Sequence, residues 1–174
     1  RYSQLYDEAL ELADAGDVPP PPDELGIEEL TIDDWLRAYK IARILYEWIN
    51  EVEEDAIVER YGIGLGDLSN IIDTATWLTY AAARICSVLG MKQHANTLSI
   101  LSVRIENGVR EDAVELVKVR GIGRVRARIL INAGIRTLQD LVATPRTKLA
   151  SLPYFGEKVV EEILKSAREI LSLI

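Results

Sequence analysis

The chain has 174 residues, of which 48% are hydrophobic and 28% are charged. This composition is typical of a folded globular protein and excludes a disordered or collagen-like chain, and the length suffices for one domain or two small ones. With one cysteine and one histidine, Cys86 and His94, the sequence excludes an internal disulfide and a Cys/His zinc cluster. No apolar run reaches the roughly 18 residues of a membrane helix, and no signal peptide opens the chain, so we expect a cytoplasmic protein.

The formal net charge of −8 hides an uneven distribution of charge. Residues 1–60 carry 5 basic and 17 acidic side chains, whereas residues 61–174 carry 15 basic and 11 acidic ones. Eight of the basic side chains lie between Lys118 and Lys148, where Asp140 is the one acidic residue. Such a segment favours a surface that binds a polyanion, although a solvated charged face is the alternative.

The N-terminal segment is acidic and contains a run of prolines. A short helix is expected over residues 4–15, and the run from Pro19 to Pro22 predicts an extended connector with no helix. We assign residues 1–30 to this N-terminal segment or linker.

A helical bundle is predicted from residue 31 to residue 108. Thr31 and Asp34 have the spacing of a capping box, which marks the start of the first helix. Asp67 is the expected N-cap of the longest helix, and Gly90 is placed where a left-handed residue would end it. The helices of the bundle are expected over residues 32–50, 54–61, 67–89 and 92–106.

An internal repeat with an offset of 33 residues organises the region from residue 109 to residue 174. The segment Gly121-Ile122-Gly123 aligns with Tyr154-Phe155-Gly156, and flanking apolar positions align as well. Each copy predicts a helix, a tight hairpin and a second helix. The first copy is expected to begin with a helix over residues 111–117, and a helix over residues 137–142 joins the copies. Because strand-like alternation is nowhere sustained, the predicted fold class is all-α.

The first hairpin has the features of an anion site. Gly121 and Gly123 let the backbone turn sharply and approach a ligand, while Ile122 between them plugs into the core. The helix that follows begins with free N–H groups and a positive dipole end. Four arginines surround this point: Arg120, Arg124, Arg126 and Arg128. The pattern predicts binding of a nucleic-acid backbone without regard to base sequence, and a turn that merely joins two packed helices is the alternative.

Trp77 lies outside the apolar stripe of the longest predicted helix. That stripe, which we expect to face the core, consists of Leu68, Ile71, Ala75, Leu78, Ala82, Ile85 and Leu89. The helical neighbours of Trp77 include Asn70, Tyr80 and Arg84, which form a polar side. A tryptophan beside a tyrosine and an arginine on such a side is typical of a stacking platform for unpaired bases. A helix packed on both sides, with Trp77 buried, is the alternative.

Several motifs of the chain carry a resemblance to a known family. They are Glu47-Trp-Ile-Asn-Glu51, Tyr61-Gly-Ile-Gly-x-Gly-Asp67-Leu68, Thr74-Ala-x-Trp77-Leu78 and Arg120-Gly-Ile-Gly-Arg124-x-Arg126-Ala-Arg128. From about Trp35 onward, the sequence resembles the C-terminal part of archaeal superfamily-2 DNA helicases of the Hjm type. These are relatives of the HELQ helicases and of the helicase region of DNA polymerase theta. The turn at Gly121 resembles the helix-hairpin-helix motif.

The resemblance implies a helical domain whose long helix acts as a ratchet under the translocating strand, followed by a small tandem helix-hairpin-helix domain that holds the strand and restrains unwinding. In these terms Trp77 matches the ratchet tryptophan that stacks on a base. Arg124, Arg126 and Arg128 match the arginine motif of the terminal domain. Asn70 departs from the family, which usually has a basic residue there, so the grip on the strand is expected to be weaker or shifted to Arg84.

The resemblance implies the C-terminal DNA-handling portion of an ATP-dependent DNA helicase that acts in replication-fork repair or recombination. The sequence has no phosphate-binding loop of the Gly-x-x-x-x-Gly-Lys-[Ser/Thr] type, so this chain alone is not expected to hydrolyse ATP. ATP and magnesium are expected to bind to other domains of the parent protein, and no cofactor or metal is expected here. The expected partners are single-stranded or forked DNA, the remaining helicase domains and replication or repair proteins, with no membrane.

Two other functions remain open. Tandem helix-hairpin-helix units also dock proteins, so the chain would be a protein-interaction module without direct DNA contact. A subunit of a structure-specific nuclease would need a metal-binding carboxylate cluster, for which the sequence offers no convincing constellation.

Overall fold

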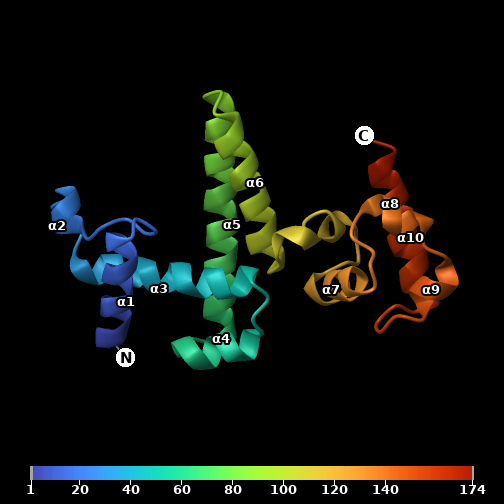
Figure 1. Cartoon of the computed structure of the whole chain (residues 1–174), viewed down its shortest axis with the longest axis horizontal. Coiled ribbons are helices and arrows are strands. Elements are labelled where there is room, and N and C mark those ends of the chain that lie inside the picture. The colour runs from blue at the N-terminus through green and yellow to red at the C-terminus, as the bar shows by residue number, and fades with distance from the viewer. Residues whose placement is uncertain (1, 174) are drawn as a thin grey trace. The chain divides into compact units, whose positions relative to one another are not determined.

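A computed structural model describes residues 2–173, and within this range all regular structure is helical (Figure 1). The all-α prediction is therefore confirmed. The chain divides into two compact units, Arg1–Glu47 and Trp48–Ile174.

In the described part of the chain, the first unit is built from three helices. They are α1 (Tyr2–Asp14), the short α2 (Pro22–Leu25) and most of α3 (Ile32–Ile49). Its small core consists of Ala9, Leu36 and Tyr39. The Trp35 indole N–H donates a hydrogen bond to the Pro19 carbonyl at 2.9 Å, which holds the proline stretch against α3.

The predicted capping box at the start of α3 is confirmed. The Asp34 N–H donates to the Thr31 hydroxyl at 3.1 Å, and the Thr31 N–H donates to the Asp34 carboxylate at 3.2 Å. The extended connector is correct only up to Pro21, because Pro22 begins α2. Proline is favoured at the first helical position, where its missing N–H would have no intrahelical partner.

The first half of the second unit contains α4 (Glu54–Tyr61), α5 (Leu65–Val88) and α6 (Lys92–Asn107). Of these, α5 and α6 form a helical hairpin. Figure 1 shows α5 and α6 lying side by side, joined by a turn in which Gly90 has the predicted left-handed φ of 75°. The N-cap prediction for α5 is wrong, because the helix begins two residues earlier than Asp67. The Asp67 carboxylate instead reaches back from inside the first turn and accepts the Gly64 N–H at 2.9 Å.

The apolar stripe predicted for α5 is only partly buried. Leu68 is buried as expected, but Leu78, Ile85 and Leu89 are exposed. The side that faces α6 is marked instead by Ala83, which is buried, and by the carbonyl of Thr76, which accepts a hydrogen bond from Ser102 of α6 at 3.3 Å. Small side chains let the two helices approach closely, and apolar periodicity does not reveal a contact of this kind.

The C-terminal part of the second unit consists of short helices around a dense core. They are two 3₁₀ turns (Glu111–Ala113 and Leu116–Lys118), α7 (Arg124–Asn132), α8 (Leu138–Ala143), α9 (Arg146–Ala150) and α10 (Glu157–Leu171). The predicted helix over residues 111–117 is wrong. The β-branched residues Val114 and Val117 lower the helix propensity of this segment. The Glu115 carboxylate accepts a hydrogen bond from the Leu138 N–H at 2.9 Å and so binds the segment to the start of α8.

In five pairs of aligned repeat positions, both members are buried in this core. These pairs are Leu116 and Leu149, Ile122 and Phe155, Ala127 and Val160, Leu130 and Ile163, and Ile131 and Leu164. In the aligned pair Val119 and Leu152, Leu152 is only partly buried. Neither copy could bury these faces alone, so the tandem arrangement follows from the repeat. Between residues 2 and 173, no helix is long and apolar enough to span a bilayer, and no group of His, Cys, Asp and Glu side chains is arranged to hold a metal ion.

Candidate nucleic-acid interface

Four of the predicted site residues share one exposed side of α5. Trp77 is 66% exposed and Tyr80, almost one turn further, is 58% exposed. Asn70 and Arg84 lie seven residues before and after Trp77, so the helix returns them to nearly the same side, and both are exposed. The structure thus places the indole in solvent rather than between packed helices.

The first hairpin of the repeat has the expected backbone. Gly121 has a φ of 88°, a left-handed conformation that favours glycine, and Ile122 is buried. Gly123 is the N-cap of α7, whose first N–H groups have no intrahelical acceptor. A cavity of about 600 Å³ lies at this turn, and its polar lining comes from Lys118, Arg120, Arg126, Ser166 and Glu169.

Arg126 connects the two hairpins. Its guanidinium donates to the Gly121 carbonyl at 2.8 Å and to the Tyr154 carbonyl at 3.0 Å. Tyr154 has a φ of 64°, which is unusual for a residue with a side chain. The guanidinium therefore holds the two turns together while one edge of it remains in the cavity.

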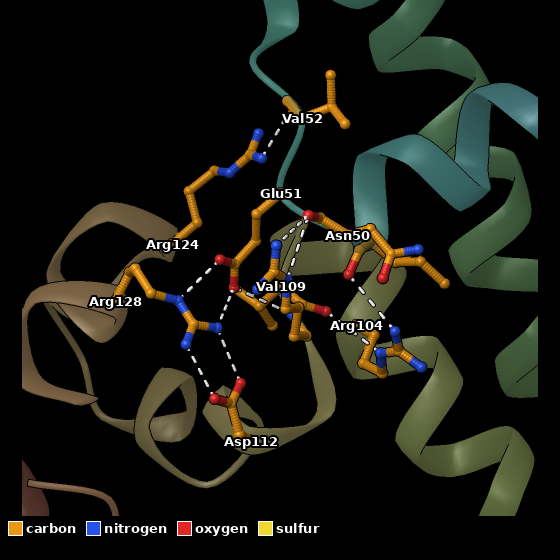
Figure 2. Close-up of polar contacts among 10 residues, drawn as sticks. Asn50, Glu51, Val52, Arg104, Val109, Asp112, Arg124 and Arg128 are labelled. Carbon is orange, nitrogen blue, oxygen red and sulfur yellow. Dashed lines mark hydrogen bonds and ion pairs between the residues drawn. The ribbon is translucent and has the colours of Figure 1, made fainter. Parts of the chain in front are cut away.

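Arg124 points away from the cavity, toward the segment that follows α3. It donates a hydrogen bond to the Val52 carbonyl at 3.0 Å, as Figure 2 shows. Its guanidinium carbon lies 4.4 Å from the centroid of the Trp48 ring, a distance typical of a cation–π contact. The Trp48 N–H in turn donates to the Ile105 carbonyl at 2.6 Å. Arg124 is therefore engaged by groups of the protein itself.

Arg128 is held by two carboxylates (Figure 2). It donates to Glu51 at 2.6 and 2.8 Å and to Asp112 at 2.8 and 2.9 Å. We call the set Trp48, Glu51, Asp112, Arg124 and Arg128 the arginine joint. It ties α7 both to the segment after α3 and to the 3₁₀ turn that begins the terminal region.

The electrostatics of the arginine joint favour the charged forms of all three groups. Burial raises the pKa of Glu51, but hydrogen bonds from the Arg128 side chain and the Arg110 N–H outweigh it, so this pKa lies below its usual value. The Arg128 hydrogen bond also lowers the pKa of Asp112 against a smaller effect of burial. Hydrogen bonds from Asp112 and then Glu51 raise the pKa of Arg128.

Backbone geometry around the arginine joint is unusual at two residues. Glu51 has a φ of 68°, a left-handed conformation that is costly for a residue with a side chain and is stabilised here by the bonds to its carboxylate. Gly108 has a φ of 61°, and a Cβ added to it would lie 2.5 Å from the Trp48 ring. The ring therefore packs directly on the backbone at the end of α6.

The predicted site residues thus fall into three groups and one bridging residue. The side of α5 presents Asn70, Trp77, Tyr80 and Arg84, and the hairpin presents Arg120, Gly121, Ile122 and Gly123. Arg126 bridges the hairpins, while Arg124 and Arg128 lie in the arginine joint. Their roles in DNA binding stay predictions. Sequence reasoning missed the partners Trp48, Glu51 and Asp112, although the first two lie within the motif Glu47–Glu51 that carries the resemblance.

Comparison with known proteins gives two family matches and a set of similar helicases. The family described as archaeal helicase, domain 4, matches residues 1–108, and the SAM-like helix-hairpin-helix tandem matches residues 113–169. The ATP-dependent DNA helicase Hel308 of Methanocaldococcus jannaschii is 43% identical over 142 residues, which are 82% of this chain and 11% of that protein. The protein of the same name from Pyrobaculum calidifontis is 42% identical over 134 residues, 76% of this chain and 19% of that protein. The one from Thermoplasma acidophilum is 35% identical over 150 residues, 86% and 22% respectively. The chain therefore spans between a tenth and a quarter of the length of these relatives.

Proposed function

Because the chain belongs to the archaeal helicase domain 4 family, we propose that it is the strand-handling portion of an ATP-dependent superfamily-2 DNA helicase. It grips the unwound single strand in two ways, by base stacking on α5 and by phosphate contacts at the first hairpin. ATP and Mg²⁺ bind to domains of the parent protein outside this chain, which by itself hydrolyses no ATP. The whole protein acts on forked DNA in replication-fork repair or recombination, and the terminal domain restrains unwinding.

The observation that carries this proposal is the exposure of Trp77. A large indole that is 66% exposed on a side with Asn70 and Arg84 contributes little to the packing of the chain. Each base of a single strand offers a flat face, and stacking on an aromatic side chain is worth about 1 to 3 kcal/mol per base. Since every base can stack, such a contact holds a strand of any sequence and lets it advance base by base.

The phosphate contact is assigned to the exposed part of the hairpin. Arg120 and Lys118 are exposed and line the cavity at the turn, next to the first N–H groups of α7. These donors suit a phosphate oxygen, because the helix N-terminus carries partial positive charge. In this proposal Arg124 and Arg128 do not contact the DNA but position the residues that do. They fix α7, and with it the hairpin, on the segment after α3.

A second candidate is a protein-interaction module, and one observation favours it. Arg124 and Arg128, two residues of the motif expected to meet DNA, bind acceptors within the protein. A basic region neutralised in this way leaves fewer free cations for a phosphate backbone. This candidate predicts that the chain binds a replication or repair protein and no DNA.

The decisive experiment is fluorescence anisotropy of the 174-residue chain with a labelled single strand across a salt series. We expect binding whose logarithm falls linearly with the logarithm of salt concentration, with a slope of about −0.7 for each phosphate neutralised. Trp77→Ala should weaken binding about five- to a hundredfold. Leu78→Ala, which removes an exposed apolar side chain from the next position of α5, is the matched control and should change affinity less than twofold. Absence of binding at low salt would overturn the proposal and favour the interaction module.

A further inference from the structure

A cleft lies between α5 and α6, directly beside the exposed indole. Its volume is about 400 Å³. It is lined by Ile72, Asp73, Thr76, Trp77 and Tyr80 from α5 and by Ser102 and Glu106 from α6. We call this the α5–α6 cleft. Trp77, which the proposed function uses for stacking, and the neighbouring Tyr80 therefore also border a recess in the protein.

The lining of the α5–α6 cleft suits the edge of a base and not a phosphate. It contains two carboxylates, Asp73 and Glu106, and no basic side chain. Both carboxylates belong to exposed residues, and neither has a hydrogen-bond or ion-pair partner among residues 2–173. Two unneutralised negative charges repel a phosphate, whereas each carboxylate oxygen accepts hydrogen bonds from N–H groups.

The floor of the α5–α6 cleft adds polar groups to this set. The Ser102 hydroxyl donates to the Thr76 carbonyl at 3.3 Å, which joins α6 to α5 at this point. The Thr76 hydroxyl is buried and makes no hydrogen bond within the described part of the chain. Buried hydroxyls normally have a partner, so this one retains an unused donor and acceptor.

The bases differ in what they present to such a site. Cytosine and adenine carry an exocyclic amino group with two N–H donors. Thymine presents a carbonyl acceptor and a methyl group at the corresponding positions, and its one ring N–H lies between two carbonyl acceptors. Aspartate and glutamate accept from the cytosine amino group, and single-stranded nucleic acids are read by this combination of stacking and edge contacts. A thymine carbonyl placed against a carboxylate would be repelled.

We infer that the α5–α6 cleft is a base-reading subsite, which takes the amino-bearing edge of a base stacked at Trp77. Asp73 and Glu106 accept the hydrogen bonds, so the strand is held more tightly at cytosine or adenine than at thymine. This inference rests on the proposed function, since it needs a single strand on α5. It makes the affinity for a single strand depend on base identity, which stacking alone does not do.

The experiment compares two labelled homopolymers, dC15 and dT15, by anisotropy at one salt concentration. Both are pyrimidine strands of equal charge and length, so their affinity ratio isolates the base edge. We expect the wild-type chain to bind dC15 about five- to tenfold more tightly than dT15. The double variant Asp73→Ala with Glu106→Ala, which removes both acceptors, should bring this ratio close to one. Removing two negative charges raises the affinity for both strands equally and leaves the ratio informative.

A control pair with the same chemistry lies on α4. Asp55 and Glu59 are exposed and four residues apart, and the double variant Asp55→Ala with Glu59→Ala should keep the wild-type ratio. If the wild-type chain binds both strands equally, or if the cleft variant keeps the preference, the inference is wrong while the proposed function stands. If neither strand binds at low salt, the proposed function fails and the inference fails with it.

Discussion

The exposed side of α5 and the arginine joint differ in how far the protein satisfies their side chains. Trp77 on α5 is mostly in solvent, so its ring is accessible to a ligand. The guanidinium of Arg128 in the arginine joint is bound by the carboxylates of Glu51 and Asp112. The sequence suggests a DNA contact for both. The difference separates a group free to meet a ligand from a group that sets the position of another element.

The largest expected effect of a single change falls on the backbone beneath the arginine joint. Gly108→Ala places a methyl group 2.5 Å from the Trp48 ring and imposes a φ of 61° on a residue with a side chain. We expect it to lower the free energy of unfolding by about 3 to 4 kcal/mol, as measured by chemical denaturation.

The matched control for Gly108→Ala is Gly90→Ala. Gly90 has a φ of 75° and open space around it, so only the backbone strain of about 1 kcal/mol should appear. Equal losses for the two variants would contradict the close packing of Trp48 on Gly108.

The second effect concerns the charges of the arginine joint. Arg128→Ala leaves the carboxylate of Glu51, which is largely buried, without its strongest partner. We expect a loss of about 2 to 3 kcal/mol in the free energy of unfolding. Arg146→Ala, which removes an exposed arginine of α9, should stay within about 0.5 kcal/mol. A loss near zero for Arg128→Ala would show that the joint is not a structural tie.

The third effect is the pH dependence of that same joint. The pKa values of Glu51 and Asp112 are lowered in the folded chain. Their contribution to stability is therefore fully present at pH values above the pKa values that these carboxyl groups have in the unfolded chain. It is lost as the pH falls through the lower, folded-state pKa values. The stability difference between wild type and Arg128→Ala should therefore narrow by about 1 kcal/mol between pH 7 and pH 3, given that Asp112 is partly screened by solvent. Denaturation curves at both pH values measure this, and a constant difference would contradict it.

The smallest expected effect on stability belongs to the side of α5. Trp77→Ala should change the free energy of unfolding by less than about 0.5 kcal/mol, because the indole is exposed. The same variant should lose most of its affinity for single strands. A loss of 2 kcal/mol or more in the free energy of unfolding would mean that Trp77 supports the fold, and the contrast between the two regions would disappear.

The fold could largely be predicted because local signals agree with tertiary packing. The capping box at Thr31 sets a helix start, and the 33-residue repeat aligns pairs that are buried together, such as Leu130 with Ile163. The error in the apolar stripe of α5 has a cause in the packing of α5 against α6. Leu78 and Ile85 look like core residues by their period, but α6 packs on a different side of α5 where small residues allow close contact.

The candidate site was predictable only as far as its residues act locally. The left-handed turn at Gly121 follows from the glycine pattern. Helical periodicity set Trp77 apart from the apolar stripe but left open whether the indole is exposed or buried. The partners of Arg128 could not be predicted, because Glu51 lies 77 residues away in sequence and reaches the guanidinium from a left-handed backbone conformation. Long-range ion pairs of this kind leave no periodic signal.

The most direct test of the whole account is tryptophan fluorescence during titration with a single strand. Trp77 lies on the proposed stacking side, whereas Trp48 is buried under Arg124 in the arginine joint. We predict that the emission of the wild-type chain falls as the strand saturates it, and that Trp77→Ala, at strand concentrations high enough for binding, shows no change in emission. An equal change in Trp77→Ala would show that the strand acts near Trp35 or Trp48 and not at the exposed indole, which contradicts the account.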